Sequence, residues 1–546
     1  MTDNPGGRRS RGVLVAVAGL TALTLVLSGC SRSAGAMPEG VVADPAGAQA
    51  GSAPAAATAI MEGPAYRAAR WTYQVSDLDT GEVLLANRPD EFVFTASTAK
   101  LFTVGSVYEA MGADARLTTP VYAVGLVEQG VLQGDLALVA SGDLTMGGRN
   151  APDGRADSTF TATTVDHVYG DIAPNAVEPP GDPLAGLDSL AAQVAAAGIH
   201  RISGDVLVDD RLWQPFDGQE GPVPPIFVND NLLDLTVTPA TAGQPATVSA
   251  SPRTSAYEVI SEVRTDAGAD SQLQVSADPR DPRRVIVTGS IGTEAGPHLT
   301  VYRVPDPTAW ARTLFVEALA RHGVTVTADP LAANRPAALP APGSYVPAQQ
   351  VAALQSPPIS ALGTMVLKTS YNTGANALMC LLAVHQGSTD CLDGLEPMRE
   401  LVTTAGLVAD DVVLVDGQGA DPASVTPAQM VTWLRWTQTR PWKDAFMTGQ
   451  PVLGESGSLA GSGGDGPAKG KVAAKTGTSA HPDPATGRAL FNVQRLAGFM
   501  TGPDGHTLAF DLAVSGATYP DVLTGLVQAG HDVADVAAEI QQGLSR

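Results

Sequence analysis

The chain has 546 residues, which is too many for one ordinary hydrophobic core and predicts two or three domains. Hydrophobic residues make up 44% of the sequence and charged residues 16%, a composition typical of a globular protein and not of a disordered one. The net charge of −23 disfavours a nucleic-acid partner, because phosphate binding needs a positively charged surface.

The first thirty residues are typical of an export signal. A basic segment ending at Arg11 precedes an apolar run from Val13 to Leu27, which is shorter than the roughly 20 residues that span a membrane. The run closes with Leu27-Ser28-Gly29-Cys30, which resembles the lipobox of bacterial lipoproteins. We therefore predict a signal peptide over residues 1–29, lipidation of Cys30, and an exported protein anchored to the membrane and facing the cell wall. An ordinary signal peptide or an uncleaved anchor is the alternative.

Two segments separate the signal from the first motif. Residues 30–62 are mostly Ala, Gly, Ser and Pro, and we expect them to form a flexible tether. Beyond the tether, a predicted strand, the turn Asp79-Thr80-Gly81 and a second strand lead toward a helix that begins at Ser97.

The middle of the chain differs in character from both ends. Between residues 116 and 344, short β-like runs alternate with Pro, Asp and Gly clusters, and one helix-like segment interrupts them at Ala309 to His322. We interpret this stretch as inserted β-rich domains, one or two in number with two favoured. The catalytic domain is then split into residues 63–115 and 345–546. Near its end, two strands flank Gly502-Pro503-Asp504-Gly505 as a hairpin, and the last thirty residues have the periodicity of a helix.

Ser97-Thr98-Ala99-Lys100 is the first of three motifs that could carry chemistry. Residues three apart on a helix share a face, so the hydroxyl of Ser97 and the amine of Lys100 can be neighbours. A lysine removed from water loses its proton near neutral pH and can act as a base. The motif is weak by itself, but the chain has only six lysines and this is one of them.

The other two motifs lie far downstream. Ser370-Tyr371-Asn372 precedes an apolar helical run, and Lys475-Thr476-Gly477-Thr478 lies on a predicted strand. A glycine close to the lysine leaves room for a substrate strand to pair along the edge of a sheet. By itself, each motif would be interpreted as a surface turn.

Taken in this order, the three motifs resemble the active-site set of serine penicillin-binding proteins and serine β-lactamases. The long stretch between the first and second motifs resembles the D-alanyl-D-alanine carboxypeptidase/endopeptidase family of low-molecular-mass penicillin-binding proteins, which carries two extra domains there. Further runs also fit that family: Ser141-Gly142-Asp143-Leu144-Thr145, Val425-Thr426-Pro427 and Gly454-Glu455-Ser456-Gly457-Ser458-Leu459. The resemblance implies an α+β fold, in which an antiparallel sheet and a helical region form the penicillin-binding domain.

The resemblance also implies a role for each motif. Ser97 would attack the carbonyl of the penultimate D-Ala and form an acyl-enzyme, with Lys100 as the base. Ser370 would pass a proton to the leaving nitrogen, and Asn372 would hold the lysine and the substrate amide. The terminal carboxylate would bind the third motif, Lys475, Thr476, Gly477 and Thr478. Peptidoglycan stem peptides would be the substrates and β-lactams covalent inhibitors, and no cofactor is implied.

Two positions depart from the family pattern. The middle of the second motif is often Asp and is here Tyr371, so we expect a cleft of different shape. The run Asp416-Gly417-Gln418-Gly419 has Gln418 where a serine is usual, so that a hydroxyl is missing.

The cysteines and histidines bear on disulfide formation and on metal binding. In an oxidising exported compartment, Cys380 and Cys391 are expected to form a disulfide, with a pair of buried free thiols as the alternative. The eight histidines have no metal-ligand spacing, and we expect no metal site and ordinary surface or core positions for them.

The sequence therefore predicts a serine D-alanyl-D-alanine carboxypeptidase, with endopeptidase action on cross-links left open. One alternative is a β-lactamase, although no Glu-x-x-Leu-Asn segment lies between the second and third motifs. The other is a non-catalytic cell-wall-binding lipoprotein that uses the inserted domains.

Overall fold

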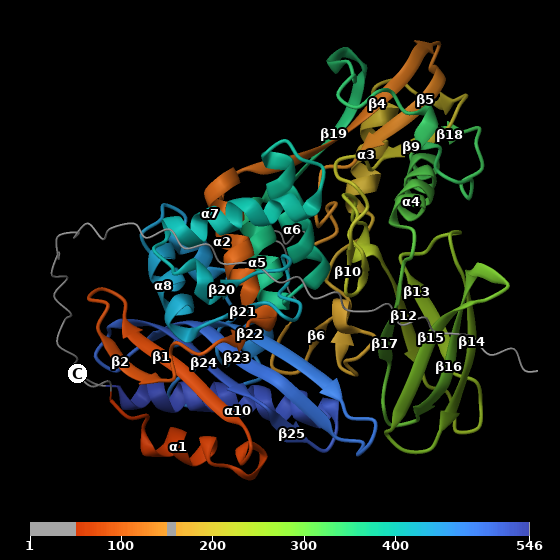
Figure 1. Ribbon diagram of the computed structural model, residues 1–546. Helices are drawn as coiled ribbons and strands as arrows, with labels where there is room; N and C mark the ends of the chain where they lie inside the picture. Colours follow the sequence, from red (N-terminus) through yellow and green to blue (C-terminus); the bar gives the residue numbers. More distant parts are fainter. Residues whose placement is uncertain (1–50, 150–159, 545–546) are drawn as a thin grey trace, which may run out of the picture. The chain divides into compact units, whose positions relative to one another are not determined.

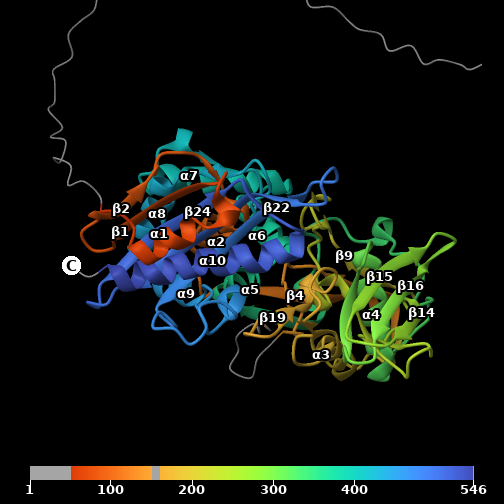
Figure 2. The same ribbon diagram turned by 90° about the horizontal axis from the view of Figure 1, so that it is seen from below.

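The computed structural model describes residues 51–149 and 160–544. The predicted signal peptide, Cys30 and most of the predicted tether lie outside these residues. The end of the expected tether differs from the prediction, because Ala55–Met61 forms helix α1, which packs on helix α10 (Val522–Gly543) (Figure 2). Ala57 is fully buried in this contact. Small residues that resemble a linker in the sequence here allow two helices to approach closely.

A five-stranded antiparallel path forms the centre of the region outside the insertion (Figure 1). Its strands, in order across the sheet, are β2 (Val83–Asn87), β1 (Arg70–Asp77), β24 (Thr507–Ser515), β23 (Ala489–Thr501) and β22 (Val472–Pro482). The short strand β25 (Ala517–Tyr519) also pairs with β23. The expected hairpin is confirmed as β23 and β24, and the expected first strand pair as β1 and β2.

Helices cover both faces of this sheet. Along β23, Leu496 and Met500 pack in the same hydrophobic cluster as α10, whereas Ala497 and Phe499 pack in the cluster of the opposite helical region. Alternate residues of a strand point to opposite faces, which explains why this strand is apolar on both sides. The helical region contains α2 (Lys100–Met111), α5 (Ile359–Thr369), α6 (Asn372–His385), α7 (Leu395–Thr404), α8 (Pro427–Thr437) and α9 (Lys443–Thr448). Within the described residues no helix, α10 included, is long and apolar enough to cross a membrane.

The inserted region begins with a mixed sheet whose order is β18-β8-β5-β4-β19, with β9 also paired to β5. Its strands are β4 (Arg116–Glu128), β5 (Val131–Val139), β8 (Arg201–Ile202), β9 (Val206–Asp209), β18 (Thr325–Val326) and β19 (Gln350–Pro358). Helices α3 (Ala185–Ala196) and α4 (Pro307–Arg321) pack against it. The sequence predicted α4 but not α3.

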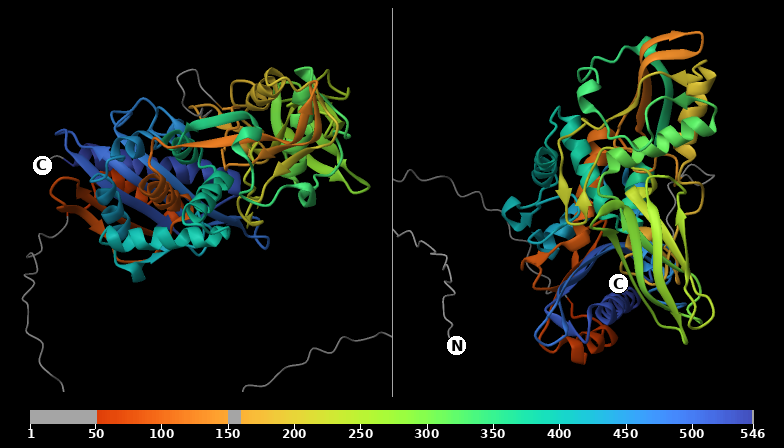
Figure 3. Two further views of the ribbon diagram at one scale, coloured as in Figure 1. Left: turned by 90° about the horizontal axis from the view of Figure 1, so that it is seen from above. Right: turned by 90° about the vertical axis from the view of Figure 1, so that its right-hand side faces the viewer.

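Two small three-stranded sheets complete the insertion (Figure 3). One has the order β13-β12-β17 and the other β14-β16-β15. Their strands are β12 (Leu232–Thr238), β13 (Thr247–Ser251), β14 (Glu258–Asp266), β15 (Ser271–Asp278), β16 (Asp281–Gly292) and β17 (His298–Arg303). Leu235 of the first sheet and Val287 of the second belong to one buried cluster, so the two sheets share a core.

The end of the insertion lies later in the chain than the predicted residue 344. Strand β19 pairs antiparallel with β4, from Gln350 opposite Tyr122 to Pro358 opposite Arg116. No sequence pattern indicated this pairing, because the residues of β19 would fit either region. The chain re-enters the helical region directly afterwards, at Ile359 in α5.

Candidate active site

The first motif lies where a 3₁₀ turn (η2, Ala96–Ala99) runs into α2, and Lys100 is the first residue of the helix. The side chain of Lys100 is fully buried. Its Nζ donates hydrogen bonds to Ser97 Oγ at 2.7 Å, to Asn372 Oδ1 at 2.7 Å and to the Gln418 carbonyl oxygen at 3.1 Å. The predicted proximity of hydroxyl and amine is therefore present.

A close approach of two loops holds this turn in place. Gly419 has a φ of +94°, and a Cβ at this position would lie 1.9 Å from the Ala96 carbonyl oxygen. Only a residue without a side chain fits there. The loop is itself fixed by Asp416, whose Oδ1 accepts hydrogen bonds from the backbone N–H groups of Gln418, Gly419 and Ala420.

The electrostatic environment of Lys100 favours the neutral amine. Burial lowers the pKa of Lys100 to about 7, and the negative charges of Glu220 and Asp416 offset part of that effect. The amine is thus partly unprotonated near neutral pH. An unprotonated amine at 2.7 Å from a serine hydroxyl can accept its proton.

The second motif joins two helices through an unusual backbone conformation. Ser370 ends α5 with a φ of 59°, in the left-handed region, and Asn372 begins α6. The hydroxyl of Tyr169, from the inserted region, donates to the Ser370 carbonyl oxygen at 2.9 Å. The Ser370 hydroxyl accepts a hydrogen bond from Lys475 Nζ at 2.8 Å. The second and third motifs are therefore in direct contact.

Tyr371 is the first of the two departures from the family pattern. Its side chain is buried in the hydrophobic cluster that also contains Leu144 of the insertion. It also packs against Gly374, where an added Cβ would lie 2.4 Å from the Tyr371 ring. Tyr371 thus fills the core beside the motif.

The third motif lies on β22, the last strand of the sheet order. Lys475 is fully buried, and burial together with the charge of Lys100 holds its pKa well below the ordinary value for lysine. An added Cβ at Gly477 would lie 2.7 Å from the Thr95 carbonyl oxygen, so the strand can pass this closely beside the first motif only with glycine there. Thr476 Oγ1 lies 2.7 Å from Ser458 Oγ, and Thr478 Oγ1 donates to Gln494 at 2.8 Å.

Sequence reasoning missed the residues that the insertion contributes. A short hairpin, β10 (Asp217–Gly218) and β11 (Gly221–Pro222), has Gln219 and Glu220 at its turn. Glu220 Oε1 accepts a hydrogen bond from Asn372 Nδ2 at 2.5 Å, and Gln219 Oε1 accepts one from Gln418 Nε2 at 2.9 Å. No local pattern distinguishes these residues from other polar turn residues.

Gln418, the second departure from the family pattern, is also buried. Its Oε1 accepts a hydrogen bond from Asn376 Nδ2 at 3.3 Å, in addition to the bond that its Nε2 donates to Gln219. The longer side chain thus connects α6 to the inserted hairpin.

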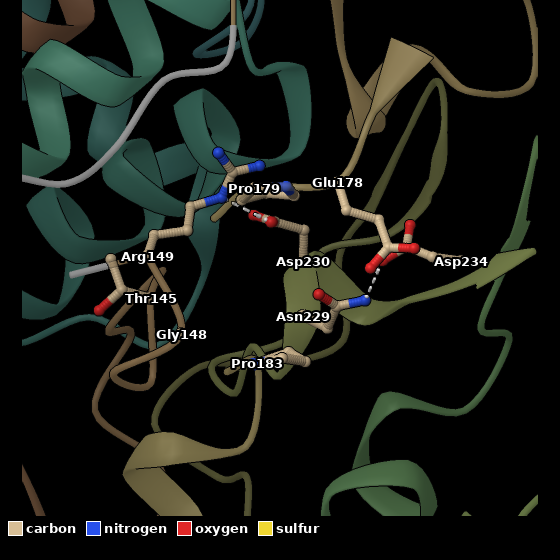
Figure 4. Close-up of a pocket in the computed structure, with 9 residues that line it drawn as sticks. All are labelled: Thr145, Gly148, Arg149, Glu178, Pro179, Pro183, Asn229, Asp230 and Asp234. Carbon is tan, nitrogen blue, oxygen red and sulfur yellow. Dashed lines mark hydrogen bonds and ion pairs between the residues drawn. The ribbon is translucent and has the colours of Figure 1, made fainter. Parts of the chain in front are cut away.

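A second buried cluster of charged residues lies in the insertion (Figure 4). Arg149 forms a bidentate pair with Asp166 at 2.8 and 2.9 Å and also contacts Asp230 at 2.7 Å. The ring nitrogens of His167 lie 2.8 Å from Asp230 and 2.9 Å from Asp234. Burial by itself would lower the pKa of His167, but the charge of Asp234 and hydrogen bonds to both carboxylates outweigh it and raise the pKa to about 10.

His167 is therefore a buried core residue that carries a charge, which its spacing in the sequence did not indicate. The adjoining pocket, lined by Arg149, Asp230 and Asp234 among others, has a volume of about 10 Å³, enough for roughly one water molecule. Among residues 51–149 and 160–544, no group of three or more His, Cys, Asp or Glu side chains is arranged to hold a metal ion.

Cys380 and Cys391 are joined by a disulfide in the structure. Cys380 lies in α6, which begins with Asn372, and Cys391 begins the following 3₁₀ turn. The bond links the middle of the helix that begins with Asn372 to the turn that follows the helix. Cys30 lies outside the described residues.

Comparison with known proteins identifies relatives over nearly the whole chain. The profile of the D-Ala-D-Ala carboxypeptidase 3 (S13) family matches residues 54–532. A D-alanyl-D-alanine carboxypeptidase from an Actinomadura species is 29% identical over 95% of this chain and 89% of its own length. A D-alanyl-D-alanine carboxypeptidase, DacB, from Haemophilus influenzae is 22% identical over 82% of this chain and 85% of its own length.

The fold also has a counterpart among solved structures. The crystal structure of penicillin-binding protein 4 from Haemophilus influenzae superposes with a TM-score of 0.64 at 19% identity, covering 89% of this chain and 99% of that one. The same protein has also been solved in complex with a β-lactam. The expected α+β penicillin-binding fold is confirmed.

Proposed function

We propose, for a chain that belongs to the D-Ala-D-Ala carboxypeptidase 3 (S13) family, that Ser97 is the nucleophile of a serine D-alanyl-D-alanine carboxypeptidase acting on peptidoglycan stem peptides. One observation carries the assignment of the nucleophile. A buried lysine amine, with a pKa lowered to about 7, lies 2.7 Å from the Ser97 hydroxyl and 2.7 Å from the Asn372 amide oxygen. Few serines in a protein have an unprotonated amine as a hydrogen-bond partner.

Acylation follows from this contact. Ser97 Oγ attacks the carbonyl carbon of the penultimate D-Ala while its proton moves to Lys100 Nζ. The C–N bond to the terminal D-Ala then breaks, and the leaving nitrogen takes a proton through Ser370, which Lys475 contacts at 2.8 Å. Backbone N–H groups of Ser97 and Thr478 would stabilise the negative oxygen of the intermediate, at about 3 kcal/mol for one donor.

The third motif supplies the binding site for the terminal carboxylate. Lys475 is buried beside Lys100, and burial lowers the pKa of both lysines. A carboxylate that enters beside Lys475 restores the favourable charge pairing and raises its pKa. Thr476 and Thr478 alternate with Lys475 and Gly477 along β22, the last strand of the sheet order. The strand therefore carries a cation and two hydroxyls within four consecutive residues.

Water completes the reaction by cleaving the ester of the acyl-enzyme, with Lys100 again available as the base. Endopeptidase action on a cross-link requires only a different amine as the leaving group, so the same chemistry extends to it. β-Lactams would acylate Ser97 by opening the lactam amide, and no leaving group departs in that step. A stable adduct is therefore expected.

The protein is expected to act outside the cytoplasm, facing the cell wall. The basic and apolar segment over residues 1–29 and the lipobox-like Cys30 support export and lipid anchoring. Mass spectrometry of the protein isolated from membranes tests this part separately. A diacylglyceryl group on Cys30 is expected, and a mature protein without lipid would contradict the anchor while leaving the catalytic proposal unaffected.

The catalytic proposal is tested by intact-protein mass spectrometry after incubation with benzylpenicillin. Wild-type protein and a Ser189→Ala control, altered at an exposed serine of α3, should each carry one adduct, and Ser97→Ala should carry none. Wild-type protein should also release D-Ala from a pentapeptide. An adduct that turns over within seconds would indicate a β-lactamase, and absence of both adduct and D-Ala release would indicate a non-catalytic protein.

A further inference from the structure

The inserted hairpin β10–β11 reaches the catalytic residues through two side-chain contacts. Gln219 accepts a hydrogen bond from Gln418, whose carbonyl oxygen in turn accepts one from Lys100. Glu220 accepts a hydrogen bond from Asn372, whose amide oxygen accepts one from Lys100. Gln219 and Glu220 thus each reach the proposed base, Lys100, through one intervening residue.

We propose that Glu220 is a positioning residue for acylation, which fixes the orientation of the Asn372 amide and supplies a negative charge that acts on Lys100. The inference rests on the proposed function of Ser97 and Lys100. It gives a residue of the insertion a part in the acylation step that the three motifs carry out.

The chemistry of the Asn372 amide supports a role for Glu220 in orienting it. An asparagine side chain has one end that accepts hydrogen bonds and one that donates them, and a carboxylate only accepts. With Glu220 Oε1 at 2.5 Å, the Nδ2 end of Asn372 is held toward the hairpin. The Oδ1 end is then left to face Lys100 Nζ at 2.7 Å. Without the carboxylate, the amide could rotate and present a donor to the lysine.

Contacts behind Glu220 hold the carboxylate in place. Arg303, at the end of β17, approaches Glu220 Oε2 at 3.4 Å. The same guanidinium donates to the Val168 carbonyl oxygen at 2.9 Å and pairs with Asp171 at 3.0 Å. Glu220 therefore has one oxygen on the catalytic amide and the other beside an arginine anchored in the insertion.

The negative charge of Glu220 supports its effect on the pKa of Lys100. The charged groups that act on Lys100 are Glu220 and Asp416, which raise its pKa, and Lys475 is the neighbouring cation. Burial acts in the opposite direction and is the largest effect. Removal of the Glu220 charge therefore lowers the pKa of Lys100 further, so the amine is unprotonated at lower pH.

Two substitutions separate orientation from charge. Glu220→Gln keeps the shape and an acceptor oxygen but removes the charge, so the acidic limb of the acylation rate should move to lower pH by about one unit. Glu220→Ala removes the acceptor as well, and acylation should slow about tenfold or more even at the optimal pH. Asp217→Asn, an exposed carboxylate on the same hairpin, is the matched control and should match wild type.

The substrate used in the assay decides between positioning and direct substrate binding. Benzylpenicillin has no stem-peptide side chain, so a residue that only binds such a side chain would leave acylation by benzylpenicillin unchanged. We expect both the penicillin and the pentapeptide reaction to slow in Glu220→Ala, with partial recovery in Glu220→Gln. Wild-type rates and an unshifted pH profile in both variants would overturn the proposal. Failure of the proposed function differs, because the wild-type protein would then form no adduct.

Discussion

Two clusters of buried cations in this molecule behave in opposite ways. In the candidate active site, Lys100 and Lys475 are fully buried, and the pKa of each is lowered. In the insertion, Arg149 and His167 are equally buried, and the pKa of each is raised. Burial is the largest effect in all four, so burial alone does not explain the difference.

The hydrogen-bond partners of these cations explain why their pKa values shift in opposite directions. Arg149 and His167 contact the carboxylates of Asp166, Asp230 and Asp234 at 2.7 to 2.9 Å. Within the part of the chain that the structure describes, neither lysine forms an ion pair, and both bond hydroxyl, amide or carbonyl oxygens instead. A buried cation with carboxylate partners stays charged and holds segments together, whereas one with neutral partners becomes a reactive amine.

The largest effect is expected from removing the reactive amine. Lys100→Met should slow acylation by benzylpenicillin about 10²- to 10⁴-fold, because the proton of Ser97 then has no base. Stopped-flow or mass-spectrometric acylation rates measure this. Lys471→Met, which changes an exposed lysine just before β22, should acylate at the wild-type rate. Normal acylation by Lys100→Met would remove the lysine from the mechanism.

Breaking the paired cluster should cost stability. Asp230→Ala removes a carboxylate that both Arg149 and His167 contact, and leaves two buried cations incompletely paired. We expect the free energy of unfolding to fall by about 3–5 kcal/mol, measured by chemical denaturation. The exposed pair of Asp266 and Arg264 in the same insertion is the comparison, and Asp266→Ala should leave unfolding unchanged. Equal stability of the two variants would show that the buried cluster is not a stabilising element.

The smallest and most specific expectation concerns pH. With a pKa of about 7, Lys100 is mostly protonated below that pH, so the acylation rate should rise with pH across neutrality and level off above it. Each pH unit below 7 should lower the rate about tenfold, since the neutral fraction falls by that factor. A rate that is flat from pH 5 to 8 would contradict a titrating lysine base. His167, with a pKa of about 10, should stay charged over the same range.

The residues that meet in the candidate active site could be predicted from the sequence. Ser97, Lys100, Ser370, Asn372 and Lys475 belong to three short motifs, and these were recognised together because their order resembles the active-site set of a known family. The strand pair at the start, the hairpin at the end and the final helix also follow from local periodicity and turn residues. These features depend on neighbours within a few residues, and a single sequence records such neighbours directly.

How the insertion contacts the candidate active site is visible only in the folded structure. Glu220, Gln219 and Tyr169 come from polar or aromatic positions with no local signature, and they contact the second motif only after distant segments fold together. The pairing of β19 with β4 and the packing of α1 on α10 were likewise invisible. Whether a buried cation is reactive or structural depends on which oxygen atoms surround it. That surrounding is set by long-range packing, which no local pattern of residues specifies.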